Sequence, residues 1–290
     1  MNLLLDNTFS TNHYISISEK MKKITMFFLY FNTIDRVKCL DEDFRKITDN
    51  GVSNHQHKYI KYKLLHFPNG CTSDTINCAF QSHKFGKCLY HIFYSANILH
   101  DNHLSFTIVH LHGESDKYKG DVVCNSPFVM HPDNSLPLLN DFSYSFYFPI
   151  IDLRNTSLFF SRSLLTNPYI CIDVFLITYL VHLNIDVFTR DHMMYVFDLY
   201  TKDRPLNNVE MITSLLEYFI DYKKNDVVKY LLQFKYTWTY FSFCYFFVLY
   251  YPEQLQVNGL YEIFIKYIES SNVERNKNIL KDIHNLLFDV

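Results

Sequence analysis

The spacing of hydrophobic residues divides the chain into two parts with different predicted secondary structure. Up to about Ser163, short runs of β-branched and aromatic residues alternate with turn signals such as Pro132-Asp133-Asn134, a pattern typical of antiparallel strands. We therefore predict a β-rich sheet, barrel or sandwich, with one short helix over Asp41–Thr48. The predicted strands are Ile24–Phe31, Tyr59–Phe67, Cys88–Ser95, Leu104–His112, Val122–Met130 and Tyr144–Ile151.

After Asn167-Pro168 the hydrophobic residues recur at helical spacing. Ile170, Val174 and Ile177 begin a first helix, for which Asn167 is the predicted N-cap and Pro168 belongs to the first turn. Short loops between the helices predict antiparallel helical hairpins. Further N-caps are predicted at Thr189, Asn207 and Asn225. The expected helices span Ile170–Val181, Arg190–Tyr200, Val209–Tyr222, Asp226–Phe234, 239–251, 259–269 and 273–288.

These patterns together predict an α+β chain, with a β-rich antiparallel domain over residues 1–165 and an all-helical domain over 166–290. The composition agrees with a folded protein, since 48% of the 290 residues are hydrophobic and 20% are charged. Only 6 Gly and 8 Pro are present, which argues against a Gly-rich phosphate loop or a proline-rich linker. The high numbers of Phe (27) and Tyr (23) are typical of proteins encoded by AT-biased genomes. We interpret these residues mainly as core residues.

The 7 scattered cysteines, an odd number, together with the lack of a signal-sequence pattern, predict a reducing cytoplasmic location. The longest uncharged stretch, Tyr236–Tyr251, is shorter than the roughly 20 residues that a membrane helix needs. We therefore expect no membrane association. The same stretch is aromatic enough to be a protein-binding surface, although burial in the core is the expectation we prefer.

Local charge gives the main functional signal. The formal net charge of the chain is −3, yet between Ser53 and Ile92 five lysines face a single acidic residue, Asp74. Lysines neutralise phosphates and aromatic rings stack on unpaired bases, so this stretch predicts RNA binding. The alternative is a solvated edge strand that its lysines protect from aggregation. The candidate RNA-binding residues are His55, His57, Lys58, Tyr59, Lys61, Tyr62, Lys63, Lys84, Phe85 and Lys87.

The sequence contains no standard catalytic motif, so we predict a binding protein without a cofactor. The alternative is a metal-dependent hydrolase that uses His110 and His112, because a strand projects the two residues of an His-x-His pair from one face. The histidines and cysteines lack compact ligand spacing, and we expect no bound metal. A third possibility is a helical scaffold that binds only proteins.

The overall organisation resembles the ribosome dormancy factors of microsporidia. The resemblance consists of an AT-biased chain with few linkers, a β-rich half with the basic stretch His55–Lys63 (HQHKYIKYK), and a helical half. It implies hibernation, that is, translation inhibition by a protein that contacts rRNA and ribosomal proteins near the tRNA exit site. In that case the helical domain would supply the protein contacts.

Overall fold

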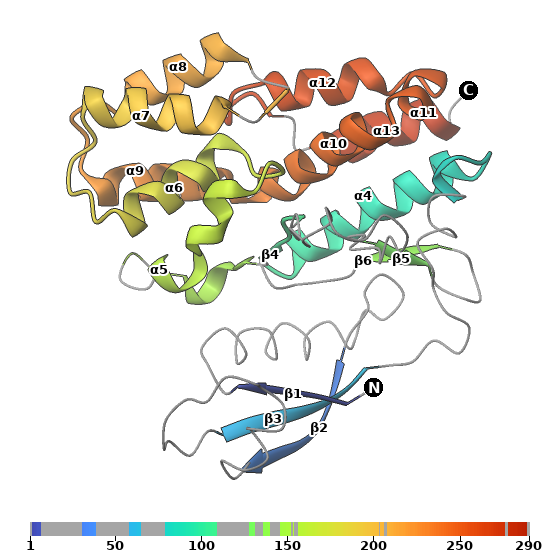
Figure 1. Ribbon diagram of the computed structural model, residues 1–290. Coiled ribbons are helices and arrows are strands. Elements are labelled where there is room, and N and C mark those ends of the chain that lie inside the picture. Colours follow the sequence, from blue (N-terminus) through green and yellow to red (C-terminus); the bar gives the residue numbers. More distant parts are fainter. Residues whose placement is uncertain are drawn as a thin grey trace, which may run out of the picture.

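The computed structural model is mostly helical in the part of the chain that it describes (Figure 1). This part comprises residues 2–6, 31–38, 58–64, 79–108, 128–130, 136–139, 146–151, 153, 156–202, 204–205, 208–275 and 278–288. The α-helices are α4 (Phe85–Asp101), α5 (Thr156–Phe159), α6 (Ile172–His182), α7 (Arg190–Thr201), α8 (Val209–Tyr218), α9 (Lys224–Leu231), α10 (Trp238–Tyr250), α11 (Pro252–Val257), α12 (Tyr261–Glu269) and α13 (Ile279–Phe288). Short 3-10 segments are η2 (Phe148–Ile150), η3 (Arg162–Thr166) and η4 (Leu232–Thr237).

The described strands form three small antiparallel ladders. The first ladder has the order β1-β3-β2, with β3 (Lys58–Leu64) between β1 (Asn2–Asp6) and β2 (Phe31–Lys38). The other two are two-stranded and pair β4 (Leu104–Ser105) with β7 (Phe146–Tyr147), and β5 (Phe128–Met130) with β6 (Pro137–Leu139).

The prediction of a β-rich N-terminal domain is therefore wrong. The clearest error is Cys88–Ser95, which belongs to helix α4 and not to a strand. Its Ile, Phe and Tyr residues favour strands in isolation, but burial on one helix face outweighs that preference. Of the predicted strands Leu104–His112 and Val122–Met130, the described residues in strands are only Leu104–Ser105 and Phe128–Met130.

Other predictions for the first half have mixed outcomes. Strand β3 agrees with most of the predicted Tyr59–Phe67, whereas Tyr144–Ile151 contains only the two strand residues of β7 before η2. The predicted helix Asp41–Thr48 lies outside the described residues. Buried residues from Phe80 to Ile283 form one hydrophobic cluster, and the boundary near residue 165 stays a prediction.

The helices predicted for the second half are present, but most of their predicted caps are wrong: Asn225 lies inside α9, whose N-cap residue is Lys223. The Thr189 hydroxyl caps α7 as predicted and accepts a hydrogen bond from the His192 amide at 3.4 Å. Helix α8 is capped by Asn208 in place of Asn207. Asn167 does not cap α6, because that helix begins later and its N-cap residue is Cys171. The Asn167 Oδ1 accepts from the Tyr169 amide at 3.0 Å, and its Nδ2 donates to the Ile108 carbonyl at 2.7 Å.

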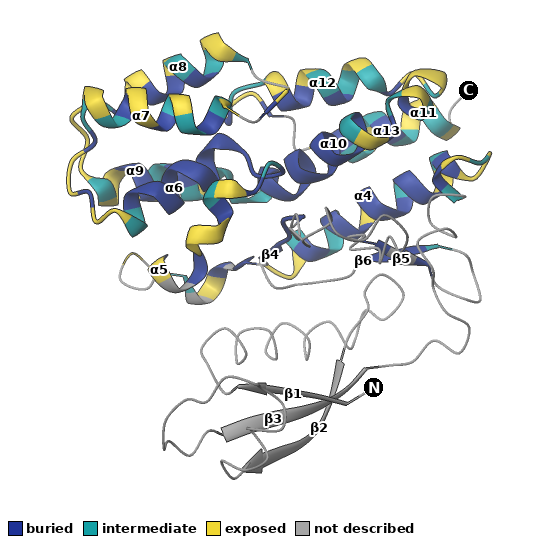
Figure 2. Ribbon diagram, in the orientation of Figure 1, coloured by how far each residue is buried: buried dark blue, intermediate teal, exposed yellow. Residues whose placement is uncertain are grey.

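Helix α10 lies at the centre of the core. Every residue from Trp238 to Val248 is buried (Figure 2), which confirms that the aromatic stretch Tyr236–Tyr251 is mainly core. Helix α10 packs against α4 and α12, and α13 packs against α4. Phe247 meets the rings of Phe80 and Phe85 edge to face, at centroid distances of 5.4 and 6.1 Å. Such contacts add to the free energy of area burial by about 0.5–1.5 kcal/mol each.

Two hydroxyl side chains of α10 hold an extended segment against the helix. The Thr239 hydroxyl accepts from the Phe106 amide at 2.9 Å, and the Ser242 hydroxyl accepts from the Ile108 amide at 2.9 Å. Residues three apart share one helix face, and residues two apart share one side of an extended segment. Thr239 and Ser242 therefore both face the side of the segment that carries the Phe106 and Ile108 amides. Each of these buried amides has a hydrogen-bond acceptor on α10 and needs no neighbouring strand.

We expect Thr239→Val to lower the free energy of unfolding by about 1–3 kcal/mol, because the substitution removes the acceptor of a buried amide. Thr239→Ser keeps the hydroxyl and should retain most of that stability. Urea denaturation followed by circular dichroism measures both variants. Equal stability of the valine and serine variants would contradict the role assigned to the hydroxyl.

Candidate functional site

The exposed face of α4 carries a line of lysine and tyrosine residues. Lys84, Lys87, Tyr90 and Tyr94 follow one another at spacings of three or four residues, which places them on one face of the helix. Both lysines are exposed, Tyr94 is 40% exposed and Tyr90 is half-buried. We call these four residues the lysine–tyrosine strip.

Helix α13 supports the tyrosine end of this strip. The Tyr90 ring packs against Phe288 at a centroid distance of 5.3 Å and against His284 at 5.6 Å. It also stacks on Tyr94, with centroids 6.1 Å apart and an interplanar angle of 22°. Gly86 allows the close packing, since a Cβ there would lie 3.1 Å from a methyl group of Leu287. Tyr90 is therefore fixed in place, and Tyr94 is the ring that presents a surface.

The lysine end of the strip has an unfavourable position for helix stability. Lys84 is the N-cap residue and Lys87 lies in the first turn, which contains no acidic residue. Because the amino end of a helix carries a partial positive charge, each lysine there lowers the stability of the helix by about 0.3–1 kcal/mol. The same charges attract an anion to this end of α4.

The other predicted RNA-binding residues lie in different surroundings. Phe85 is only 2% exposed and belongs to the core, so its ring is closed to a stacking base. His55 and His57 lie outside the described residues. Lys58, Tyr59, Lys61, Tyr62 and Lys63 all belong to β3.

Strand β3 is the central strand of its ladder, so it is not the edge strand of the alternative interpretation. Lys61 is paired with Leu4 of β1 and with Asp35 of β2. An acidic residue thus occupies the register position opposite a predicted phosphate-binding lysine.

The metal interpretation rests on His110 and His112, which lie outside the described residues. Within the described part of the chain, no group of three His, Cys, Asp or Glu side chains is placed to hold a metal ion. The described cysteines are Cys88, Cys171 and Cys244, all buried thiols. Burial raises the pKa of Cys171 to about 12, and it raises the pKa of the other two as well. These thiols are therefore protonated at neutral pH and are poor nucleophiles.

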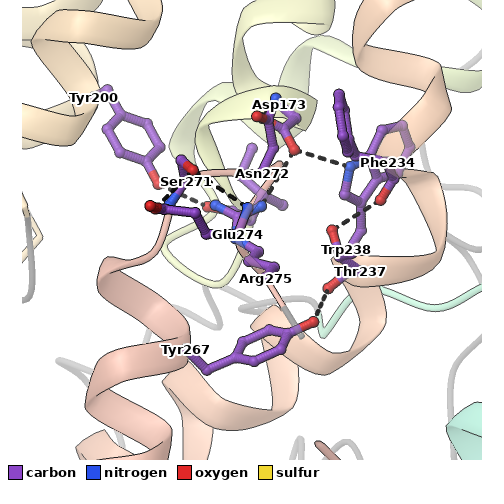
Figure 3. A network of polar contacts seen from close by, with 11 residues as sticks. Asp173, Tyr200, Phe234, Thr237, Trp238, Tyr267, Ser271, Asn272, Glu274 and Arg275 are labelled. Atoms are coloured by element: carbon purple, nitrogen blue, oxygen red, sulfur yellow. Dashed lines mark hydrogen bonds and ion pairs between the residues drawn. The ribbon is translucent and has the colours of Figure 1, made fainter. Parts of the chain in front are cut away.

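A second polar site lies inside the core (Figure 3). The Asp173 carboxylate of α6 pairs with the Arg275 guanidinium at 3.2 Å, and both side chains are fully buried. Trp238 Nε1 and Asn272 Nδ2 each donate to this carboxylate at 3.3 Å. The network joins α6, α10 and the turn between α12 and α13.

Neither charged group of this pair is in contact with water, and this loss of solvation affects the pKa of the carboxyl group. Burial raises the pKa of the Asp173 carboxyl, while the Arg275 guanidinium and the hydrogen bonds from Trp238 and Asn272 oppose the rise. Arg275 also lies over the Phe241 ring, 4.8 Å from its centroid. Arg275 Nε and Nη2 and Asn272 Oδ1 make no hydrogen bond with any described residue. A buried network that is only partly satisfied contributes more to positioning than to net stability.

The turn that carries Arg275 also lines a small cleft. The cleft has a volume of about 260 Å³, and its lining includes Lys266, Tyr267, Glu274 and Asp282. Organic ligands usually occupy pockets of roughly 300–1,000 Å³. Asp173 and Arg275 are fully buried and do not line this cleft, so we assign the pair to the fixing of the turn.

Two features escaped the sequence analysis although the sequence contains a signal for each. Asp173 is the only charged residue between Pro168 and His182, and a lone acid in an apolar helix has to be buried with a partner. Tyr94 follows Tyr90 by four residues and Lys87 by seven, which is helical spacing. The prediction of a strand over this segment concealed that line.

Comparison with protein-family models, curated proteins and solved structures gives no match to this chain. In the described residues, each helix is too short or too polar to cross a membrane.

We expect Arg275→Met to lower the free energy of unfolding by about 3–5 kcal/mol, because it leaves the Asp173 carboxylate buried without its partner. The double variant Asp173→Leu/Arg275→Met removes both charges and should regain most of that loss. Glu274→Gln, an exposed change on the same turn, is the matched control and should shift stability by about 0.5 kcal/mol at most. Chemical denaturation measures all three. A double variant as unstable as Arg275→Met would contradict the assignment.

Proposed function

We propose that the protein is a non-enzymatic, cytoplasmic binding protein that associates with ribosomes, and that the lysine–tyrosine strip contacts RNA. The single observation that carries the proposal is the line formed by Lys84, Lys87, Tyr90 and Tyr94 on the exposed face of α4. The resemblance to ribosome dormancy factors suggests the wider role, in which the bound protein keeps an idle ribosome inactive near the tRNA exit site.

The strip combines the two interactions that proteins use for unpaired RNA. The lysine ammonium groups can neutralise phosphates and release counterions, and the exposed face of Tyr94 can stack on a base. Their order along the helix places the charges at one end and the rings at the other. A strand of RNA lying along α4 would meet both in succession.

The placement of the lysines favours a functional explanation over a structural one. Two lysines at the amino end of a helix oppose the helix dipole, and no acidic residue in the first turn compensates for them. Residues that break a local rule without a compensating contact are typical of binding sites. The formal net charge of −3 implies that RNA contacts are local, so ribosomal proteins would supply the remaining contacts.

Co-sedimentation with ribosomes and binding to single-stranded RNA, each over a series of salt concentrations, test the proposal. We expect Lys84→Glu/Lys87→Glu to weaken binding and to reduce the slope of log K against log salt by about 1.4, since each lost contact removes about 0.7 for a single strand. Tyr94→Ala should weaken binding by roughly 5-fold to 150-fold with little change in slope.

The matched control is Lys223→Glu/Lys229→Glu, which reverses two exposed lysines at and within α9 and should leave binding unchanged. A folded Lys84→Glu/Lys87→Glu variant with unchanged affinity and slope would remove the strip from the proposal. The triple variant of Lys58, Lys61 and Lys63 would then test β3. Wild-type protein that does not sediment with ribosomes at low salt would contradict the ribosomal role itself.

A further inference from the structure

Three basic side chains gather around the Tyr236 ring, where the end of α4 meets η4 and α10. The His100 ring meets the Tyr236 ring edge to face, with centroids 5.4 Å apart. His103 Nδ1 lies 3.3 Å from the Tyr236 hydroxyl, and the Lys235 ammonium lies 5.2 Å from the ring centroid. We call His100, His103, Lys235 and Tyr236 the basic cluster. Among the described residues, no carboxylate forms an ion pair with its basic groups.

His100 is the member of the basic cluster that packs against the core. Its side chain is half-buried, and its ring meets Tyr240 of α10 edge to face with centroids 4.9 Å apart. His100 Nε2 lies 3.4 Å from the Thr239 hydroxyl. Burial lowers the pKa of His100 to about 3, whereas an unperturbed histidine has a pKa of about 6.5. The closed structure therefore holds His100 neutral at neutral and mildly acidic pH.

In the described part of the chain, a proton on His100 would have no buried counter-charge. The Lys235 ammonium faces the same Tyr236 ring, so it would repel a second positive charge there. Burial raises the pKa values of Tyr240 and of Tyr267, which lies behind it on α12, so both hydroxyls are neutral. Asp101 follows His100 in the chain but is exposed, and water and salt screen its charge.

The Thr239 hydroxyl couples His100 to the segment that follows α4. This hydroxyl accepts a hydrogen bond from the Phe106 amide at 2.9 Å and lies 3.0 Å from the Ser105 hydroxyl. A hydroxyl has one donor and two acceptor sites, so His100, Ser105 and Phe106 together use its full capacity. Between α4 and this segment, His103 adopts a left-handed backbone with φ of 60°, which costs energy in a residue with a side chain. The junction thus combines a shared hydroxyl with a strained turn.

We propose that the basic cluster is a pH-dependent switch, in which acid protonates His100, moves its ring into water and releases residues 104–108 from α10. The open form binds one more proton than the closed form. Closure is therefore stable above about pH 6.5 and weakens as the pH falls from 6.5 toward 3. Between pH 7 and pH 5 the ratio of open to closed molecules rises roughly 25-fold, and any closed-state pKa below about 4 gives nearly the same change. The switch is independent of RNA binding by the lysine–tyrosine strip.

Amide hydrogen exchange of the full-length protein, measured by NMR at about pH 7 and about pH 5 and corrected for intrinsic exchange rates, tests this proposal. We expect the opening constant at the Phe106 amide to rise roughly 25-fold in the wild type and less than about 3-fold in His100→Gln. Glutamine can bond to the Thr239 hydroxyl but takes up no proton. A purely structural role of His100 would change the exchange equally at both pH values. The matched control is His83→Gln before α4, an exposed histidine, which should respond to pH as the wild type does.

Several results would overturn the proposal. They are a wild-type opening constant that rises less than about 3-fold between the two pH values, and an equal rise in wild type and His100→Gln. An equal rise at the amides of α6 would mean global unfolding in place of a local release, and would overturn it as well. If His100→Gln does not fold, NMR titration of the histidine rings in the wild type replaces it. A His100 ring that takes up its proton near pH 6.5 while the Phe106 amide stays protected then overturns the proposal.

Discussion

A helix that is apolar on every side has to be enclosed by the rest of the chain, and α10 sets this requirement for the whole protein. All residues from Trp238 to Val248 are buried, whereas an ordinary surface helix buries one stripe. Helix α4 covers α10 on one side and α12 on another. Segments about 150 residues apart in the sequence must therefore meet before either gains its full burial energy.

The polar interactions of the core follow from the same enclosure. Among the α10 side chains that bond to other segments, Thr239 and Ser242 contact residues 105–108, and Trp238 contacts Asp173 of α6. Apolar packing has no direction, whereas these hydrogen bonds fix how each segment is turned and shifted along α10. The buried Asp173–Arg275 pair does the same for the turn after α12, at little net gain in stability.

The sequence was sufficient to predict the helices after Asn167, but it was not sufficient to predict the secondary structure of the first half of the chain. Helices after Asn167 were readable from their periodicity, whereas capping residues located the helix start correctly at Thr189 but not at Asn167, Asn207 or Asn225. In α4 residue preference and periodicity conflict, since Ile92, Phe93 and Tyr94 favour strands individually while Cys88, Leu89, Ile92 and Phe93 lie on one helix face. For the candidate site, Lys84 and Lys87 were found from charge alone. Tyr94 required the helix, and the burial of Phe85 required the tertiary structure.

The contact between α10 and the extended segment also affects how the protein can associate with other chains. An extended segment with free amides on one side is a template for further strands, and hence for aggregation. In this protein the Phe106 and Ile108 amides donate to the hydroxyls of Thr239 and Ser242. Those donors are no longer available to a strand from another molecule. Two small polar side chains on a largely aromatic helix thus protect this buried extended segment from intermolecular β-pairing.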